Sequence, residues 1–143
     1  MATEIKIKNL PIGFQSIISN GRHSILGDEP IRSKGTDLGF SPEDLILSSL
    51  AMCKVATVRY IARKNGWEIG NVDGHLIQKV KRHPGGKLFT HVQVQIDIEG
   101  NLTEEQREKL LYEADRCYVH RMIEGEWNIE NSIREGVLLE EAA

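Results

Sequence analysis

The feature that most constrains this chain is a long apolar stretch between residues 41 and 66. The sequence SPED at residues 41–44 is typical of a helix start, because serine caps free amide groups, proline suits the first helical position and acidic residues face the positive end of the helix dipole. The pattern predicts a helix that runs to Lys64 or Asn65 and ends at Gly66. Such a helix would have about 24 residues and a length of about 36 Å.

Apolar residues cover nearly every side of this predicted helix. They are Leu45, Ile46, Leu47, Leu50, Ala51, Met52, Val55, Ala56, Val58, Ile61 and Ala62. A helix that is apolar all round is normally buried. In a chain of 143 residues it needs cover on several sides, so we expect a second layer of structure or a second subunit against it.

Strands are predicted on both sides of the long helix. Residues 4–8 alternate between charged and apolar, and the segments FQSIIS and RHSIL flank Asn20-Gly21, a strong signal for a two-residue hairpin. The turn sequence HPGGK separates residues 75–82 from residues 89–99, and the latter segment alternates most cleanly. Antiparallel hairpins with separate helices indicate an α+β fold. No linker interrupts the chain, so we expect one domain over residues 1–143.

A second helix is predicted to begin at a capping box in the sequence TEEQ, residues 103–106. Leu110, Ala114 and Cys117 follow at positions i, i+4 and i+7, and therefore share the apolar face of that helix. The next segment, VHRMIEG, is expected to form a short turn that leads into a last strand around residues 127–129.

The composition excludes several classes of function. A hydrophobic content of 40% and a charged content of 27% are typical of soluble globular proteins, and a net charge of −3 gives no reason to expect a nucleic-acid partner. The N-terminal sequence has no signal-peptide region, and no run of 18 apolar residues occurs, so we expect a cytoplasmic protein without a membrane partner. No phosphate-binding or dinucleotide-binding motif is present, and we expect no cofactor.

The available chemistry centres on the two cysteines, Cys53 and Cys117. They do not form a CxxC pair, which argues against a thioredoxin motif or a zinc ribbon. Each lies on an apolar helix face, where a free cysteine is usually a buried structural thiol. The alternative is a redox pair, in which a thiol oxidised to sulfenic acid condenses with a second thiol to form a disulfide. That reaction would need the two Cα atoms to come within about 4.4–6.8 Å.

Charged residues near the long helix could support a reactive thiolate. Glu43 precedes the cysteine of that helix by ten residues, about 15 Å along the axis, so it cannot touch the thiol but could hold an arginine against it. Arg22 and Arg32, in the preceding hairpin and loop, are the candidates. His120 forms a Cys-x-x-His pair with Cys117, but a stable zinc site needs three or four protein ligands, so we expect no metal site.

Two sequence motifs together resemble the OsmC/Ohr family, the osmotically inducible protein C and organic hydroperoxide resistance proteins. The first is GTDLGFSPEDLILSSLAMCKVATVRYIARKNGW, in which Pro42-Glu43, Cys53 and the RKNG sequence at residues 63–66 are similar to the central helix of the family. The second is LLYEADRCYVHRMIEG, which is similar to the segment of the second family cysteine, usually written C-P-V-H. Tyr118 stands here in place of the proline, and the DEP sequence before the first motif fits one branch.

The resemblance implies an OsmC-like α+β fold with an antiparallel sheet and two central helices, assembled as an intertwined homodimer. Cys53 would be the peroxidatic thiol that reduces an organic hydroperoxide and becomes a sulfenic acid, and Cys117 would resolve it to a disulfide. Glu43 would orient an arginine against the thiolate, with Arg32 slightly favoured over Arg22. Reduction of the disulfide would need an external dithiol, of lipoyl type in the best-understood branch.

We therefore expect a thiol-dependent peroxidase of the stress response that detoxifies organic hydroperoxides. The alternative is a protein that keeps this fold but binds a small apolar ligand, or serves a structural role, without peroxidase turnover. In the structural interpretation, both cysteines would be inert core residues of a dimer.

Overall fold

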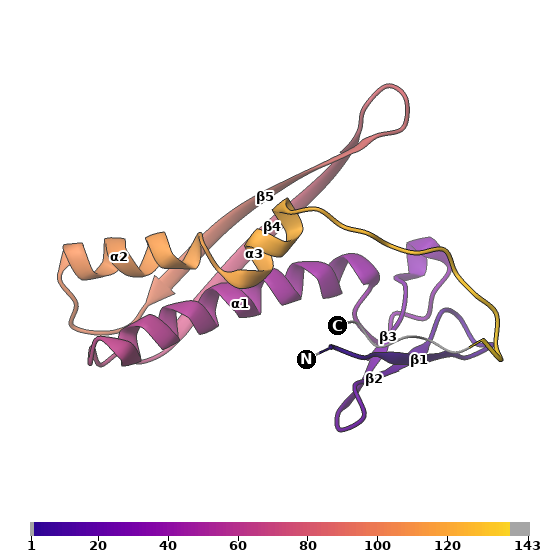
Figure 1. The fold of residues 1–143 in the computed structure, drawn as a ribbon, viewed down its shortest axis with the longest axis horizontal. Helices are drawn as coiled ribbons and strands as arrows, with labels where there is room; N and C mark the ends of the chain where they lie inside the picture. Colours follow the sequence, from indigo (N-terminus) through magenta and orange to yellow (C-terminus); the bar gives the residue numbers. More distant parts are fainter. Residues whose placement is uncertain (1, 138–143) are drawn as a thin grey trace. The chain divides into compact units, whose positions relative to one another are not determined.

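The structure, a computed structural model, describes residues 2–137 (Figure 1). The chain divides into two compact units. The first comprises the described residues of Met1–Leu45 and Trp127–Ala143, and the second is Ile46–Glu126. All paired strands are antiparallel and the helices lie outside the sheets, which confirms the α+β class. That residues 1–143 form one domain stays a prediction.

The first unit contains a small antiparallel sheet and a short helix. Its strands are β1 (Lys6–Asn9), β2 (Ser16–Ser19) and β3 (Ser24–Gly27), paired in that order. The 3₁₀ helix η1 (Ile31–Ser33) follows in the loop that leads to the long helix. The predicted first strand and hairpin are therefore present, with short strands of four residues each.

The tip of the first hairpin lies one residue later than predicted. The amide of Asn20 donates to the carbonyl of His23 (3.2 Å), so Gly21 and Arg22 form the tip. Gly21 has a φ of 95°, a conformation that favours glycine. The side-chain oxygen of Asn20 accepts from the amides of Arg22 (2.9 Å) and His23 (2.8 Å), which explains why asparagine stands before the tip rather than in it.

Asp28 organises the loop between β3 and the long helix. Its Oδ1 accepts from the amides of Phe14 (3.2 Å), Glu29 (2.8 Å) and Thr36 (3.4 Å). Its Oδ2 accepts from the amide of Leu38 (3.2 Å) and from the hydroxyl of Thr36. The hydroxyl of Thr36, supported by the backbone amides, holds the pKa of Asp28 well below its ordinary value, although burial opposes this. The polar loop is thus an ordered structure around one buried carboxylate.

The long helix α1 (Pro42–Lys64) has the predicted bounds. The amide of Asp44 donates to Ser41 Oγ (3.1 Å), and the amide of Ser41 donates to Asp44 Oδ2 (3.0 Å), so both residues cap the start reciprocally. Gly66 adopts a left-handed conformation with a φ of 71° just after the helix. The predicted start and stop signals are therefore confirmed.

Only one stripe of α1 is buried within the chain: Leu50, Lys54, Val58 and Ala62. On other faces Ile46 (54%), Met52 (73%) and Tyr60 (55%) are exposed. Burial on all sides, as expected from the sequence, is thus not provided by the described residues of one chain.

By length and composition α1 could also cross a membrane, although core helices of soluble proteins meet the same criterion. The absence of a membrane partner stays a prediction.

The second unit combines α1 with a long hairpin and two shorter helices. Strands β4 (Val72–Arg82) and β5 (Leu88–Ile98) pair antiparallel over eleven residues each. Helix α2 (Glu104–Ala114) begins at the predicted capping box of Thr103 and Gln106, and α3 (Tyr118–Glu124) follows it. Figure 1 shows α2 beside the C-terminal half of α1, whereas the β4–β5 hairpin diverges from α1 and its tip extends away from the helix.

The core of the second unit joins these elements. It consists of Val58, Ala62, Ile98, Leu110 and Ala114. Residues from α1, β5 and α2 therefore meet in one apolar cluster, and the predicted apolar face of α2 is the face that is buried. Burial of apolar surface is the main favourable contribution to such packing.

Two predictions for the C-terminal part are wrong. The segment VHRMIEG forms helix α3 rather than a short turn, because Cys117 has the extended conformation of an N-cap and its carbonyl accepts from the amide of Arg121 (3.1 Å). The described residues 126–137 contain no strand. Trp127 is 60% and Ile129 80% exposed, so two alternating apolar residues bury too little surface to hold a strand.

Replacing Asp28 by asparagine should lower the midpoint of thermal unfolding. The pKa of Asp28 is lower in the folded chain than its ordinary value of 3.8, so the ionised carboxylate stabilises the fold above that pH. This contribution is lost as the pH falls toward the folded pKa. Thermal unfolding followed by circular dichroism between about pH 6 and about pH 3 should show a smaller acid-induced loss for Asp28→Asn than for the unchanged chain.

The matched control for this prediction is Asp37→Asn. Asp37 lies in the same loop, is exposed and has a φ of 53°, which asparagine tolerates. The control removes the same charge and should unfold like the unchanged chain. Equal unfolding midpoints for Asp28→Asn and Asp37→Asn would contradict the role given to Asp28.

Candidate thiol site

Cys53 and Cys117 line the same cleft, although 64 positions separate them in the sequence. The cleft has a volume of about 490 Å³ and lies between α1, the end of α2 and α3. Cys53 is half-buried on α1, and Cys117 is buried at the N-cap of α3. Two thiols from different elements are therefore brought to one place by the packing of the helices.

The position of Cys117 follows from the apolar face of α2. Leu110 and Ala114 are fully buried, and Cys117 is 2% exposed one turn beyond them. Its amide donates to the carbonyl of Ala114 (3.3 Å) where α2 ends. The chain then turns into α3 directly at Cys117. The buried face of α2 thus carries the thiol toward α1, as the i, i+4, i+7 spacing predicts.

A backbone amide points at the sulfur of Cys53. The N–H of Val119, in the first turn of α3, donates to Cys53 Sγ at 3.4 Å. This contact joins α3 to the thiol of α1.

The environment of Cys117 favours its protonated form. Burial raises the pKa of the Cys117 thiol, and the hydrogen bond and the charge interaction with Cys53 raise it further. The amide of His120 and the charge of Lys54 act in the opposite direction. The net effect is a pKa above the ordinary value, so the two cysteines differ in both exposure and environment.

Lys54 is a buried charged residue that the sequence analysis missed. Its side chain is 2% exposed on the buried stripe of α1. Its Nζ donates to the carbonyl of Ala114 (3.2 Å), lies 3.0 Å from His120 Nδ1 and forms an ion pair with Asp115 Oδ1 at 3.7 Å. The sequence did contain a signal, because Lys54 is the one charged residue between positions 45 and 58 and stands four residues from both Leu50 and Val58.

His120 connects this lysine to the surface. An ammonium group only donates hydrogen bonds, so Nδ1 of His120 must accept from Lys54 and the ring proton belongs on Nε2. Nε2 lies 3.1 Å from the carboxylate of Glu124, which is 71% exposed. The histidine of the Cys-x-x-His pair noted in the sequence is therefore part of a hydrogen-bond chain. Among residues 2–137, no group of three or more metal-ligating side chains is arranged to hold a metal ion.

Two arginines that the sequence analysis did not weigh as thiolate partners line the cleft. They are Arg116 and Arg121. The guanidinium of Arg116 lies 5.6 Å from the ring of Tyr112, and that of Arg121 lies 5.7 Å from the ring of Tyr118. These cation–π contacts favour positions of both guanidinium groups beside the cleft.

The predicted partners Glu43, Arg22 and Arg32 belong to the first unit, whereas the cysteines belong to the second. Glu43 is exposed in the first turn of α1, Arg22 lies at the hairpin tip and Arg32 lies in η1. The structure thus brings the two cysteines together. The pairing of Glu43 with an arginine, and of either arginine with Cys53, stays a prediction.

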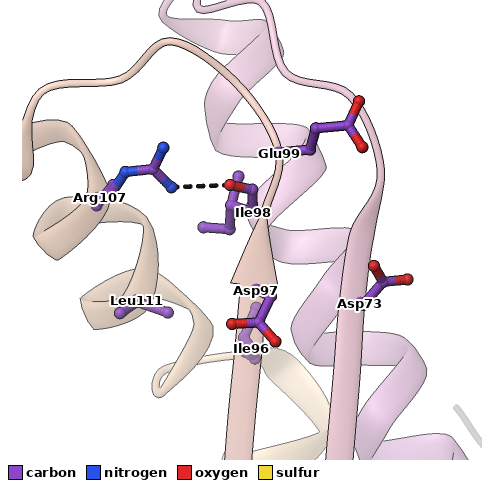
Figure 2. Close-up of a pocket in the computed structure, with 7 residues that line it drawn as sticks. All are labelled: Asp73, Ile96, Asp97, Ile98, Glu99, Arg107 and Leu111. Carbon is purple, nitrogen blue, oxygen red and sulfur yellow. Dashed lines mark hydrogen bonds between the residues drawn. The ribbon is translucent and has the colours of Figure 1, made fainter.

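A second cleft of about 390 Å³ lies beside the end of β5 (Figure 2). Its carboxylates come from Asp73, Asp97 and Glu99. Arg107 of α2 donates to the carbonyls of Ile98 and Gly100, both at 2.8 Å, and so fastens α2 to the end of the hairpin. The residues that line this cleft include no thiol, hydroxyl, amine or imidazole, and we interpret this arginine contact as structural.

Comparison with known proteins agrees with the resemblance seen in the sequence. The model of the family described as OsmC-like protein matches residues 35–132, a segment that contains both cysteines. The comparison with curated proteins gave no match.

Solved structures share the fold at low sequence identity. An OsmC-like protein from Mycoplasma pneumoniae is 19% identical, with 87% of this chain and 89% of that chain covered and a TM-score of 0.75. A protein from Psychrobacter arcticus, named for osmotic stress induction and detoxification, is 20% identical, with 85% and 88% covered and a TM-score of 0.72. An organic hydroperoxide resistance protein OsmC from Legionella pneumophila is 19% identical, with 85% and 90% covered and a TM-score of 0.65. From the match over residues 35–132, the chain belongs to the OsmC-like protein family.

Proposed function

We propose that this protein is a thiol-dependent peroxidase that reduces organic hydroperoxides. The observation that carries the proposal is the placement of Cys53 and Cys117 in one cleft, with the amide of Val119 directed at Cys53 Sγ. A lone buried cysteine is usually structural. Two cysteines facing one cleft from different elements, in a chain of this family, favour a redox pair instead.

Cys53 is the thiol that attacks the peroxide. It is half-buried, whereas Cys117 is 2% exposed and has a raised pKa caused mainly by burial. In the first step the Cys53 thiolate attacks the outer oxygen of the hydroperoxide, the O–O bond breaks, and the alkoxide takes a proton and leaves as the alcohol. Cys53 is oxidised to sulfenic acid.

Cys117 resolves this intermediate. Its sulfur attacks the sulfur of the Cys53 sulfenic acid, the S–S bond forms and the S–O bond breaks. The hydroxide takes up the proton that Cys117 releases and leaves as water. An external dithiol then reduces the disulfide by thiol–disulfide exchange and becomes a disulfide itself, which returns both cysteines to thiols.

The lining of the cleft suits an organic rather than an inorganic peroxide. Besides the cysteines it offers Ala56, Ile61, Tyr60 and Tyr118, which supply aliphatic and aromatic surface for an alkyl or aryl group. An organic hydroperoxide resistance protein from Legionella pneumophila shares the fold, and its name supports the proposed substrate. The proposed location is the cytoplasm, where the protein would have access to cellular dithiols.

The enzyme is proposed to act as a homodimer. Large apolar residues are exposed on α1 and on the hairpin of the second unit: Ile46, Met52, Tyr60, Ile77, Val80, Leu88, Phe89 and Val94. Apolar surface of this extent is unusual on a monomer. A second copy of the chain would provide the cover that an all-apolar helix needs.

Replacing Cys53 by serine should abolish the consumption of cumene hydroperoxide in the presence of a dithiol, because serine cannot form a sulfenic acid. After one equivalent of hydroperoxide and no reductant, the unchanged chain should lose the mass of two hydrogens, as a disulfide forms. Cys117→Ser should instead gain the mass of one oxygen. Equal hydroperoxide consumption by the unchanged chain and Cys53→Ser would refute the mechanism and favour the binding or structural alternative.

A substoichiometric amount of N-ethylmaleimide at neutral pH should label Cys53 severalfold faster than Cys117. The reason is that Cys117 is 2% exposed and its raised pKa keeps it protonated. Peptide mapping by mass spectrometry measures the ratio, with each single-serine variant reporting the rate of the other thiol. Faster labelling of Cys117 would reverse the roles assigned to the two cysteines.

Light scattering after size exclusion should give about twice the chain mass of 16.1 kDa. Met52→Glu places a charge on the exposed stripe of α1 and should shift the protein toward the monomer, because the charge would be buried without a partner. Lys109→Glu, at an exposed position of α2, is the control and should stay dimeric. A monomeric unchanged chain would contradict the proposed assembly.

A further inference from the structure

The ammonium group of Lys54 is buried at a position where the helix could have carried an apolar residue. It occupies the stripe of Leu50, Val58 and Ala62, which are otherwise apolar. Burying an unpaired charge costs several kcal/mol, and replacing a buried ion pair by apolar residues is often neutral or stabilising. Fold stability therefore gives no reason for a lysine here, and a functional reason has to be sought next to Cys53.

The partners of Lys54 lie at the two ends of one short segment. Its Nζ contacts the carbonyl of Ala114, the last residue of α2, at 3.2 Å and the ring of His120 in α3 at 3.0 Å. The carboxylate of Asp115, at 3.7 Å, is 72% exposed and contributes less. The carbonyl at the end of α2 also carries the negative end of its helix dipole. Lys54 thus ties residues 114 and 120 to the same point on α1.

The segment between these two contacts carries the groups that face Cys53. Residues 115–119 contain Cys117, which lines the cleft with Cys53, and Val119, whose amide donates to Cys53 Sγ. Because Lys54 holds both ends of this segment, it fixes where the second thiol lies relative to the first. A loss of the lysine contacts would free the segment to move while its apolar anchor, Leu110, stays buried.

We propose that Lys54 is a positioning residue for disulfide formation, which holds the 115–119 segment so that Cys117 can attack the oxidised Cys53. The proposal rests on the peroxidase function proposed above. The lysine is neither oxidised nor consumed: the S–S bond forms, the S–O bond breaks and hydroxide leaves with the proton released by Cys117. The charge interaction of Lys54 lowers the pKa of Cys117 and so opposes burial, in agreement with this role.

Several other charged or titratable groups line the cleft or contact Lys54 or Cys117, and they have to stay constant in a test. They are Cys53 on α1, Glu113 on α2, Asp115 and Arg116 in the turn, and His120 and Arg121 on α3. Of these, His120 acts on Cys117 through its backbone amide. A substitution at Lys54 leaves the chemical identity of all these groups unchanged.

The first test measures the pKa of Cys117 without any peroxide. In a Cys53→Ser background, Cys117 is the only cysteine, and a ¹³Cβ label on cysteine reports its ionisation by NMR. Lys54→Met should raise the midpoint, because it removes a charge that lowers the pKa of Cys117, and Lys54→Arg, which keeps the charge, should restore most of the difference. Lys64→Met, at an exposed position of the same helix, is the matched control and should leave the midpoint unchanged.

The second test separates the two chemical steps in the chain that has both cysteines. After rapid mixing with one equivalent of cumene hydroperoxide, trapping with dimedone follows the sulfenic acid and intact mass follows the disulfide. Lys54→Met should still form sulfenic acid, because it keeps Cys53, but should close the disulfide at least about tenfold more slowly, which corresponds to a barrier increase of about 1.4 kcal/mol. Lys64→Met should match the unchanged chain in both steps.

The outcomes distinguish this proposal from the proposed function. If the unchanged chain forms no sulfenic acid, the peroxidase function fails and the Cys117 midpoint alone decides about Lys54. An unchanged midpoint in Lys54→Met, or disulfide closure at the original rate, would overturn the role of Lys54 while leaving the peroxidase intact. Should Lys54→Met not fold, as judged by circular dichroism, Lys54→Arg and Lys54→Gln make the same comparison with and without the charge.

Discussion

The packing of α2 against the buried stripe of α1 is the interaction on which the second unit depends. Leu110 and Ala114 meet Val58 and Ala62 in the apolar cluster, and Cys117 continues the same face of α2. Because α2 ends at Ala114 and α3 begins at Tyr118, the cluster also decides where the turn between them lies. The cleft with its two thiols is thus a product of core packing. A site of this kind needs no dedicated loop, and the same contacts that stabilise the unit align its reactive groups.

The polar contacts within this packing have a different character from the apolar ones. Lys54 and Asp28 are the charged residues with buried side chains among residues 2–137. Asp28 accepts hydrogen bonds that order a loop in the first unit, whereas Lys54 joins three helices in the second. Buried charges are tolerated where their hydrogen-bonding capacity is used. In both cases hydrogen bonds to one charged group specify the local geometry. Apolar contacts are non-directional and do not specify geometry in this way.

Much of the fold could be predicted because its signals are local. The start and stop of α1, the capping box of α2 and the β4–β5 hairpin each depend on a few neighbouring residues. The two failures have different physical reasons. Helix α3 follows Cys117, whose side chain makes no capping hydrogen bond, so the sequence lacks the usual signal for a helix start. No strand forms around residues 127–129 because strand formation needs a partner, which a single sequence does not reveal. The shared cleft of Cys53 and Cys117 was a consequence of helix packing that spacing alone permitted but did not require.

Lys54 escaped the sequence analysis because a charged residue in an apolar run is normally read as the solvent side of a helix. Its position four residues from Leu50 and Val58 was the contrary signal, but only the structure supplies the carbonyl and the imidazole that satisfy it. The arginines of the cleft were equally out of reach, since Arg116 and Arg121 are defined as neighbours of Cys53 by tertiary structure. Residues that act on a site from a distant part of the chain are the hardest to find from one sequence.

Cys53 and Lys54 are consecutive residues, and α1 rotates by about 100° from one to the next. One therefore faces the cleft while the other faces the core, and a single helical turn serves both surfaces. The rotation of α1 about its axis therefore determines whether both side chains reach their partners. An insertion or deletion of one residue between Lys54 and Val58 would rotate both the lysine and the thiol by about 100° relative to the apolar cluster that holds Val58 and Ala62. The spacing between Lys54 and Val58 is thereby constrained as well as the identity of the residues in the site.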